Sequence, residues 1–185
     1  MKRNIVAFVG ISGVGKSTVL KSLISRFRFQ HLQASSIIGE QRSLNSENVT
    51  GDALRVVNID DNQQMLIDGF ARQIDQSASL IVLDGHTIVD TPDGLKEIEP
   101  KVFGELGITQ FVFLADDPKK IESRRIQDIT RNRPVRDHRV LGAHQEAAML
   151  SAFRAALFLK VPLIVVDPSQ IGSVHSLFER IAPNG

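Results

Sequence analysis

The sequence of 185 residues contains no cysteine. The lack of thiols excludes disulfide bonds, catalysis by a cysteine nucleophile and any zinc site ligated by cysteine. The five histidines show no spacing such as HxxxH, so the sequence does not indicate a histidine-bound metal. If a lid closes over an active site in this chain, it must be held by something other than a cysteine-bound zinc ion.

Long apolar runs and a charged-then-apolar leader are also missing. A membrane-spanning helix needs ~20 consecutive apolar residues, so we expect no membrane partner, no secretion, and a cytoplasmic location. Hydrophobic residues make up 42% of the chain and charged residues 23%, as is typical of globular proteins. The length predicts one domain over residues 1–185.

Charge is nearly balanced over the whole chain but is unevenly distributed. The net charge is +1, whereas residues 119–139 contain eight Lys or Arg and three acids, a local charge of +5 that leaves −4 for the remainder. The overall balance argues against a nucleic-acid partner. The basic segment favours an anion-binding site over a solvated helix face.

Near the N-terminus the chain matches the phosphate-binding pattern GxxxxGK[ST]. In this P-loop, or Walker A motif, glycines let backbone N–H groups approach phosphate oxygens, and the following helix directs its positive end at the same anion. Lys16 is expected to reach the β- and γ-phosphates of ATP, and Ser17 to contact Mg²⁺. The predicted ATP-binding residues are Gly10, Ile11, Ser12, Gly13, Val14, Gly15, Lys16, Ser17 and Thr18.

Apolar runs and helical periodicities alternate along the chain, which predicts an α/β fold with a parallel sheet and a ligand site beyond the carboxyl ends of its strands. Strands are expected at residues 5–9, 29–34, 80–83, 111–114 and 162–166. Helices are expected at residues 16–27, 35–41, 53–74 with a break near 58, 99–106, 118–129, 138–160 and 174–181. Ser35-Ser36 are expected to cap the second helix, Asp117 with Pro118 to begin the fifth, and Thr91–Gly94 to form a turn.

Candidate site residues follow the third predicted strand. Asp84 comes directly after four apolar residues and has the form of a Walker B acid, which holds Mg²⁺ through its hydration shell. His86 and Thr87 follow it and could contact the phosphate or polar groups of an acceptor. The alternative is that Asp84 caps a helix and that the other two satisfy the turn.

Arginines are concentrated in the basic segment. Phosphoryl transfer spreads negative charge over the transferred group, and guanidinium groups compensate that charge without being deprotonated. Arg131 and Arg133 are two residues apart, so both would face the same side of an extended loop. Ion pairing with Asp128 and Asp137 is the structural alternative for any single arginine.

The predicted helix at residues 138–160 is rich in alanine and apolar on most of its faces. We interpret its second half, residues 147–159, as a core helix, and not as a membrane or partner surface.

Together these motifs resemble the P-loop nucleoside monophosphate kinases, and among them the archaeal type of adenylate kinase. Asp84-Gly85-His86-Thr87 followed by Thr91-Pro92-Asp93-Gly94 is similar to a segment of that type. The run Arg124-Arg125, Asp128, Thr130, Arg131 and Arg133 is similar to its RRxxDxTRxR lid signature.

The resemblance implies a P-loop NTPase fold of three α/β/α layers, with five parallel strands in the order 2-3-1-4-5. It implies a monophosphate-binding region at residues 35–73 and a short lid at 130–137. Arg124 would lie near the adenine of ATP, Arg125, Arg131 and Arg133 would act as catalytic residues with Lys16, and Arg55 would contact the acceptor phosphate. The candidate acceptor residues are then Ser36, Arg55, His86 and Thr87.

We therefore expect a kinase that transfers the γ-phosphoryl group of Mg-ATP to a nucleoside monophosphate, with AMP as the first candidate. An acceptor phosphate is already anionic, so positioning and charge compensation suffice and no general base is required. A hydroxyl acceptor would need a carboxylate nearby, for which Asp84 and Asp61 are candidates. A regulatory ATPase or nucleotide switch, and a nucleic-acid partner bound by the basic segment, are further alternatives. The oligomeric state is open.

Overall fold

The apolar run that precedes the P-loop forms the central strand of a parallel sheet. The computed structural model describes residues 3–45, 47, 49, 53–54, 58–128 and 135–182. β1 (Asn4–Val9) pairs with β3 (Leu80–Gly85) on one side and with β6 (Gln110–Leu114) on the other. β2 (Gln30–Gln33) and β7 (Leu163–Val166) complete the five strands in the order β2-β3-β1-β6-β7. All four pairings are parallel, as the alternating pattern predicts.

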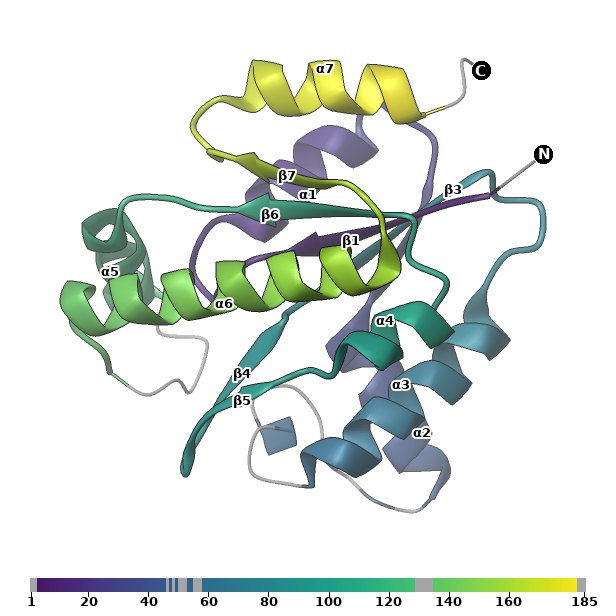
Figure 1. Cartoon of the computed structure of the whole chain (residues 1–185), viewed down its shortest axis with the longest axis horizontal. Helices are drawn as coiled ribbons and strands as arrows, with labels where there is room; N and C mark the ends of the chain where they lie inside the picture. The colour runs from purple at the N-terminus through teal and green to yellow at the C-terminus, as the bar shows by residue number, and fades with distance from the viewer. Residues whose placement is uncertain are drawn as a thin grey trace.

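Helices lie on both sides of this sheet (Figure 1). The described helices are α1 (Lys16–Ile24), α2 (Ala34–Leu44), α3 (Ile59–Gln73), α4 (Pro100–Glu105), α5 (Pro118–Gln127), α6 (His138–Leu159) and α7 (Ile171–Ile181). In Figure 1, α1 and α7 lie above the sheet, whereas α4 and α6 lie below it. None of the helices in the described ranges combines the length and hydropathy that crossing a bilayer requires.

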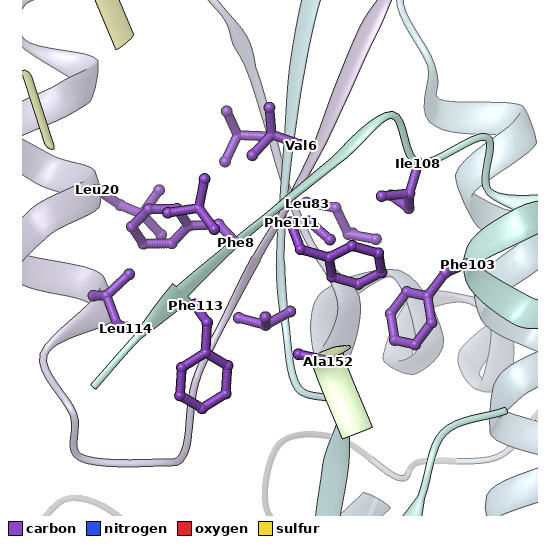
Figure 2. Packing of buried hydrophobic residues seen from close by; sticks show 14 of the residues in the cluster. Val6, Phe8, Leu20, Leu83, Phe103, Ile108, Phe111, Phe113, Leu114 and Ala152 are labelled. Carbon is purple, nitrogen blue, oxygen red and sulfur yellow. The ribbon is translucent and has the colours of Figure 1, made fainter. Parts of the chain in front are cut away.

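Alternating side chains of the strands build a core on each side of the sheet. Phe8 of β1 packs edge-on against Phe178 of α7, with ring centroids 6.4 Å apart. On the opposite side, Phe111 of β6 meets Phe103 of α4 at 5.1 Å. Figure 2 shows Phe103 beside Phe111, and Phe113 on the same side of β6 as Ala152 of α6. Both faces of the sheet are therefore covered by apolar contacts, which is why its strands read as continuous apolar runs.

Two helix starts confirm or correct the capping predictions. The Asp117 side chain accepts a hydrogen bond from the Lys119 N–H at 2.9 Å, and Pro118 occupies the first turn of α5, as predicted. The expected cap at Ser35-Ser36 is wrong, because α2 already begins at Ala34 and its N-cap residue is Gln33. Ser35 and Ser36 instead lie inside the first turn of the helix.

A hairpin that the sequence analysis did not predict changes the strand numbering. β4 (Ile88–Thr91) and β5 (Gly94–Glu97) form an antiparallel two-stranded sheet around the predicted turn. The fourth and fifth strands of the main sheet are therefore β6 and β7, and the expected order 2-3-1-4-5 differs from the observed one in this numbering. β5 is exposed along its whole length, so it lacks the apolar pattern by which a strand is recognised.

α6 corrects the interpretation of residues 147–159 as a core helix. Its buried face is formed by small side chains, among them Ala148, Ala152 and Ala155. Its large apolar residues Phe153 and Leu157 are instead exposed. Alanine brings the helix close to the sheet, and so it leaves the bulky residues on the other side of the helix facing solvent.

Candidate functional site

A cavity of about 1230 Å³ opens at the carboxyl ends of β1 and β3. One end is lined by the P-loop residues 11–13 and 15–18 together with Asp84, and the other by residues of α2 and α3. This is the edge at which an α/β sheet binds its ligands. The volume exceeds the ~300–1,000 Å³ that is usual for a site that holds one small ligand.

The P-loop has the backbone geometry that its glycines permit. Gly15 has a φ of +109°, a left-handed conformation that side chains disfavour, and it forms the N-cap of α1. Lys16 and Asp84 are both more than nine-tenths buried, and the Lys16 Nζ lies 4.0 Å from the Asp84 Oδ1. The predicted cation and the predicted metal ligand therefore meet at the floor of the cavity.

The Gly10 carbonyl accepts hydrogen bonds from two site residues. Lys16 Nζ donates to it at 2.9 Å, and His86 Nδ1 lies 2.8 Å from it. Because a carbonyl oxygen only accepts, His86 carries a proton on Nδ1 in this contact. His86 thus connects the end of β3 to the start of the P-loop, and it also lines the cavity.

Arg124 and Arg125 of α5 hold two other P-loop carbonyls. Arg124 Nη1 donates to the Val14 oxygen at 3.1 Å, and Arg125 Nε donates to the Ser12 oxygen at 2.9 Å. Alternate carbonyls of the loop are thus held from outside. Between them, the Val14 N–H donates to the Ile11 carbonyl at 3.3 Å, so this bond and the two arginines together fix the turn of the loop. Arg124 lines the cavity, whereas Arg125 lies behind the loop.

Asp116 is a site residue that the sequence analysis missed. Its side chain is almost fully buried and pairs with Arg124 Nη2 at 2.6 Å and with Lys120 Nζ at 3.6 Å. Its backbone is held in turn by the side chain of Gln145 of α6. Asp116 lies just before α5, and Lys120 and Arg124 follow it at intervals of four residues, a signal that the sequence did contain.

The turn after β7 lies against the P-loop. Pro168 lies 3.6 Å from the position that a Cβ on Gly15 would occupy. The Ser169 hydroxyl and backbone N–H hold the pKa of the neighbouring Asp167 below its ordinary value, and the charges of Lys120 and Arg124 lower it further. Asp167 is therefore a carboxylate at neutral pH.

The opposite end of the cavity is mainly apolar and carries amide side chains. Ile38, Leu54 and Leu66 contribute to the walls between α2 and α3. Gln41 also lines the cavity at 7% exposure, and no residue of the described ranges hydrogen-bonds to its amide. A side-chain amide carries both donors and an acceptor, so Gln41 is suited to a ligand with complementary groups.

The acceptor residues expected from the sequence have different positions. Ser36 and His86 line the cavity. Thr87 does not: it is fully buried, and its hydroxyl donates to the Ala148 carbonyl of α6 at 2.7 Å. We therefore correct the assignment of Thr87, which connects β3 to α6. Arg55, Arg131 and Arg133, like most of the expected lid at 130–137, lie outside the described residues.

The oxygen donors at the floor of the cavity fit Mg²⁺. Ser17 presents a hydroxyl at the start of α1, and Asp84 a carboxylate at the end of β3, and both line the same cavity. Hydroxyl and carboxylate oxygens, supplemented by water and substrate phosphates, are the ligands that Mg²⁺ prefers.

The chain is similar to known proteins over the segments that form this site. The family model described as the AAA domain matches residues 9–141, which include the P-loop, the end of β3 and the whole of α5. This chain belongs to the AAA domain family.

Relatives of this AAA domain protein include archaeal adenylate kinases. The adenylate kinase of Thermococcus onnurineus is 25% identical over 183 residues, covering 95% of this chain and 93% of that protein. The adenylate kinase of Methanoculleus marisnigri is 28% identical over 153 residues, covering 76% and 77%. These relatives confirm the resemblance indicated by the motifs and support the interpretation of the chain as an ATP-dependent phosphotransferase.

A solved structure has the same fold. The crystal structure of a sugar kinase from Janibacter sp. HTCC2649 superimposes with a TM-score of 0.57, covering 98% of this chain and 96% of that one. The sequence identity is 18%, so the likeness concerns the fold.

Proposed function

We propose that this protein is a nucleoside monophosphate kinase that transfers the γ-phosphoryl group of Mg-ATP to a nucleoside monophosphate, with AMP as the first candidate. The main observation behind this proposal is that the two ends of one cavity differ in chemistry. The P-loop, Lys16 and Asp84, the proposed polyphosphate site, lie at one end, and α2 and α3 form apolar walls with the Gln41 amide at the other. Two nucleotides lying end to end would match this division.

The donor end would bind the triphosphate of ATP. Lys16 would leave the Gly10 carbonyl to contact the β- and γ-phosphates, while Arg124 and Arg125 keep the loop in place through its carbonyls. Ser17 would hold Mg²⁺, with Asp84 acting through water. The ion would neutralise charge on the transferred group and orient the phosphates. Arg131 and Arg133 remain proposed catalytic residues.

The acceptor end would bind a planar, uncharged base between apolar walls. An amide offers one donor and one acceptor, which matches the edge of adenine, the base that Gln and Asn contact in a bidentate manner. Gln41 is therefore the proposed base-reading residue, and Ser36, Arg55 and His86 remain candidates for the sugar and phosphate. Residues 35–73 would form the monophosphate-binding region.

A phosphate acceptor also agrees with the placement of the carboxylates. Asp61, one of two candidates for activating a hydroxyl acceptor, lies on the exposed side of α3 and does not line the cavity. Asp84 is the proposed metal residue. A phosphate acceptor needs no base, because its oxygen is already a nucleophile at neutral pH.

A substrate panel tests the proposal. The protein is incubated with Mg-ATP and, separately, with AMP, GMP, CMP, UMP, adenosine or glucose, and the phosphorylated products are identified by mass spectrometry. We expect ADP from both substrates with AMP and much slower turnover with adenosine and glucose. ATP hydrolysis that proceeds equally without any acceptor would indicate the ATPase or switch, and phosphorylation of glucose would indicate a hydroxyl kinase.

A further inference from the structure

The outer face of α6 carries large apolar side chains that nothing in the described part of the chain covers. Phe153, Leu157 and Phe158 are 53%, 66% and 64% exposed. Met149 and Leu150 extend the same surface toward the middle of the helix and are exposed as well. We call these five residues, Met149, Leu150, Phe153, Leu157 and Phe158, the α6 stripe.

The α6 stripe lies beside an edge of the sheet. β7 is the edge strand next to β6, and Val165 pairs in register with Phe113. Side chains in register on parallel neighbours point to the same face, and Phe113 lies on the side of β6 where Ala152 of α6 is found (Figure 2). Val165 is half exposed, so α6 does not reach far enough to cover the edge strand. Val165 therefore adds an exposed apolar side chain on the edge strand, on the side of the sheet that α6 covers.

The size of this surface is that of a protein interface. With roughly 200 Å² for a large side chain, the stripe and Val165 at about half exposure present about 600 Å² of apolar area. This is at the upper end of the ~300–600 Å² that the largest apolar patch of a typical monomer covers, a patch that is often functional, and each partner in a standard interface loses ~800 Å². Adding the polar groups at its border brings the surface to the area that a stable dimer needs.

The charges at this border are self-complementary. Glu146 and Arg154 are both exposed and each lies four residues from Leu150, on opposite sides of it along the helix. If two copies of α6 pack antiparallel about a two-fold axis at Leu150, Glu146 of each copy faces Arg154 of the other. A two-fold interface requires a surface that complements itself in this way. Arg154 also forms an ion pair with Glu97 at 3.2 Å. Because this pair is exposed to solvent and weak, the guanidinium can bind a second carboxylate.

We propose that the α6 stripe and the exposed edge of β7 form the interface of a two-fold symmetric homodimer, with the two α6 helices antiparallel. Apolar side chains supply the contact area, and the pairs of Glu146 with Arg154 set the direction of the helices. The same helix holds Thr87 and Asp116 on its inner side, so the dimer would pack behind the proposed site without blocking the cavity. The inference does not depend on which reaction the site performs.

Sedimentation equilibrium of the full chain from low to high micromolar concentration tests the proposal. We expect a dimer mass for the wild type, and a Tm that rises with concentration because the folded subunits associate. In Phe153→Glu with Leu157→Glu, two charges per subunit are placed among the apolar side chains of the interface, and we expect the dimer Kd to rise at least ~30-fold. If the wild type is a monomer at every concentration in this range, the proposal is wrong.

A charge-swap series distinguishes the antiparallel arrangement from nonspecific association. Glu146→Arg and Arg154→Glu should each raise the dimer Kd by roughly tenfold, because like charges then face one another. Both substitutions in one chain restore the opposite charges and should return the Kd to within about threefold of the wild type. Asp68→Arg, on the exposed side of α3, is the matched charge reversal outside the interface and should leave the mass unchanged. Additive losses in the double variant would refute the antiparallel pairing.

Discussion

The two ends of the cavity are built by different means. At the donor end, side chains from three separate segments, Lys16, His86 and the arginine pair of α5, converge on carbonyls of one loop. At the acceptor end, α2 packs against α3, and the cavity wall is apolar apart from a few amide side chains. The donor end is thus specified by a short motif and a polar network. The acceptor end is specified by helix packing, which a motif does not encode.

The close approach of α2 and α3 shows how much the acceptor end depends on packing. A Cβ on Gly69 would lie 2.4 Å from the Ile37 Cγ2 and 3.0 Å from the Gln41 Cγ. Only glycine permits this helix crossing. The position of the Gln41 amide therefore depends on the absence of a side chain 28 residues later in the sequence.

The largest effect is expected from breaking the donor end at Lys16. Lys16→Ala should lower kcat by ~10²–10³-fold or more, because it removes a preorganised positive charge from the transferred phosphate. Lys21→Ala, on the exposed side of the same helix, is the control and should retain turnover. Steady-state kinetics with Mg-ATP and AMP measures both, and circular dichroism checks that the fold is intact. Full activity of the Lys16 variant would exclude the assigned phosphate role.

A smaller effect, confined to the acceptor, is expected from Gln41→Met. The substitution keeps the length of the side chain but removes the amide, so KM for AMP should rise by roughly 10–100-fold. KM for ATP should not change. Gln64→Met, on the exposed side of α3, serves as the control.

Ribose 5-phosphate, an acceptor without a base, sharpens this test. Its use by the wild type and by Gln41→Met should be equal if Gln41 reads the base. An unchanged KM for AMP in the variant would remove Gln41 from the site but leave the kinase activity itself in place, so the two proposals can fail separately.

Gly69→Ala tests the packing of the acceptor end. The added methyl group must displace Ile37 or Gln41, and we expect the free energy of unfolding to fall by about 1–3 kcal/mol. Gly172→Ala in α7 is the matched control, since a Cβ there meets nothing within 4 Å, and it should be neutral or stabilising. Urea unfolding measures both variants. Equal stabilities would contradict the tight helix crossing.

The smallest effect is expected at Asp137, outside both ends of the cavity. Hydrogen bonds from the backbone N–H groups of Val140 and Arg139 hold the pKa of this N-cap residue of α6 below its ordinary value. Its carboxylate therefore stabilises the fold above the pKa of the unfolded chain, ~3.9, and this contribution is lost as the pH falls through the lower, folded pKa.

Asp137→Asn isolates that ionisation, because asparagine also caps helices well. Tm at neutral pH should change little, whereas the decrease of Tm below about pH 4 should be shallower than in the wild type. Thermal scans across the acid range measure the difference. If Tm decreases equally in the two proteins at acid pH, the Asp137 charge does not contribute to stability.

The sequence predicted much of the donor end. The strand before the P-loop, the positions of Lys16 and Asp84 at its floor, and the Asp117 cap follow from local patterns, and the structure places each of them as expected. The sequence failed where burial decides the outcome. β5 is too exposed to read as a strand, and Thr87 faces α6 instead of the cavity.

By itself, the sequence determined the alternation of strands and helices and the phosphate-binding loop, because hydrophobic period, glycine spacing and capping act over a few neighbouring residues. Only the tertiary structure decided which face of α6 is buried, because small alanines fit closely against the sheet while Phe153 and Leu157 do not. It also decided that Asp116 holds Arg124 and that Gln41 reaches the cavity. Those contacts depend on how elements distant in the chain pack together, and no local pattern of residues contains that information.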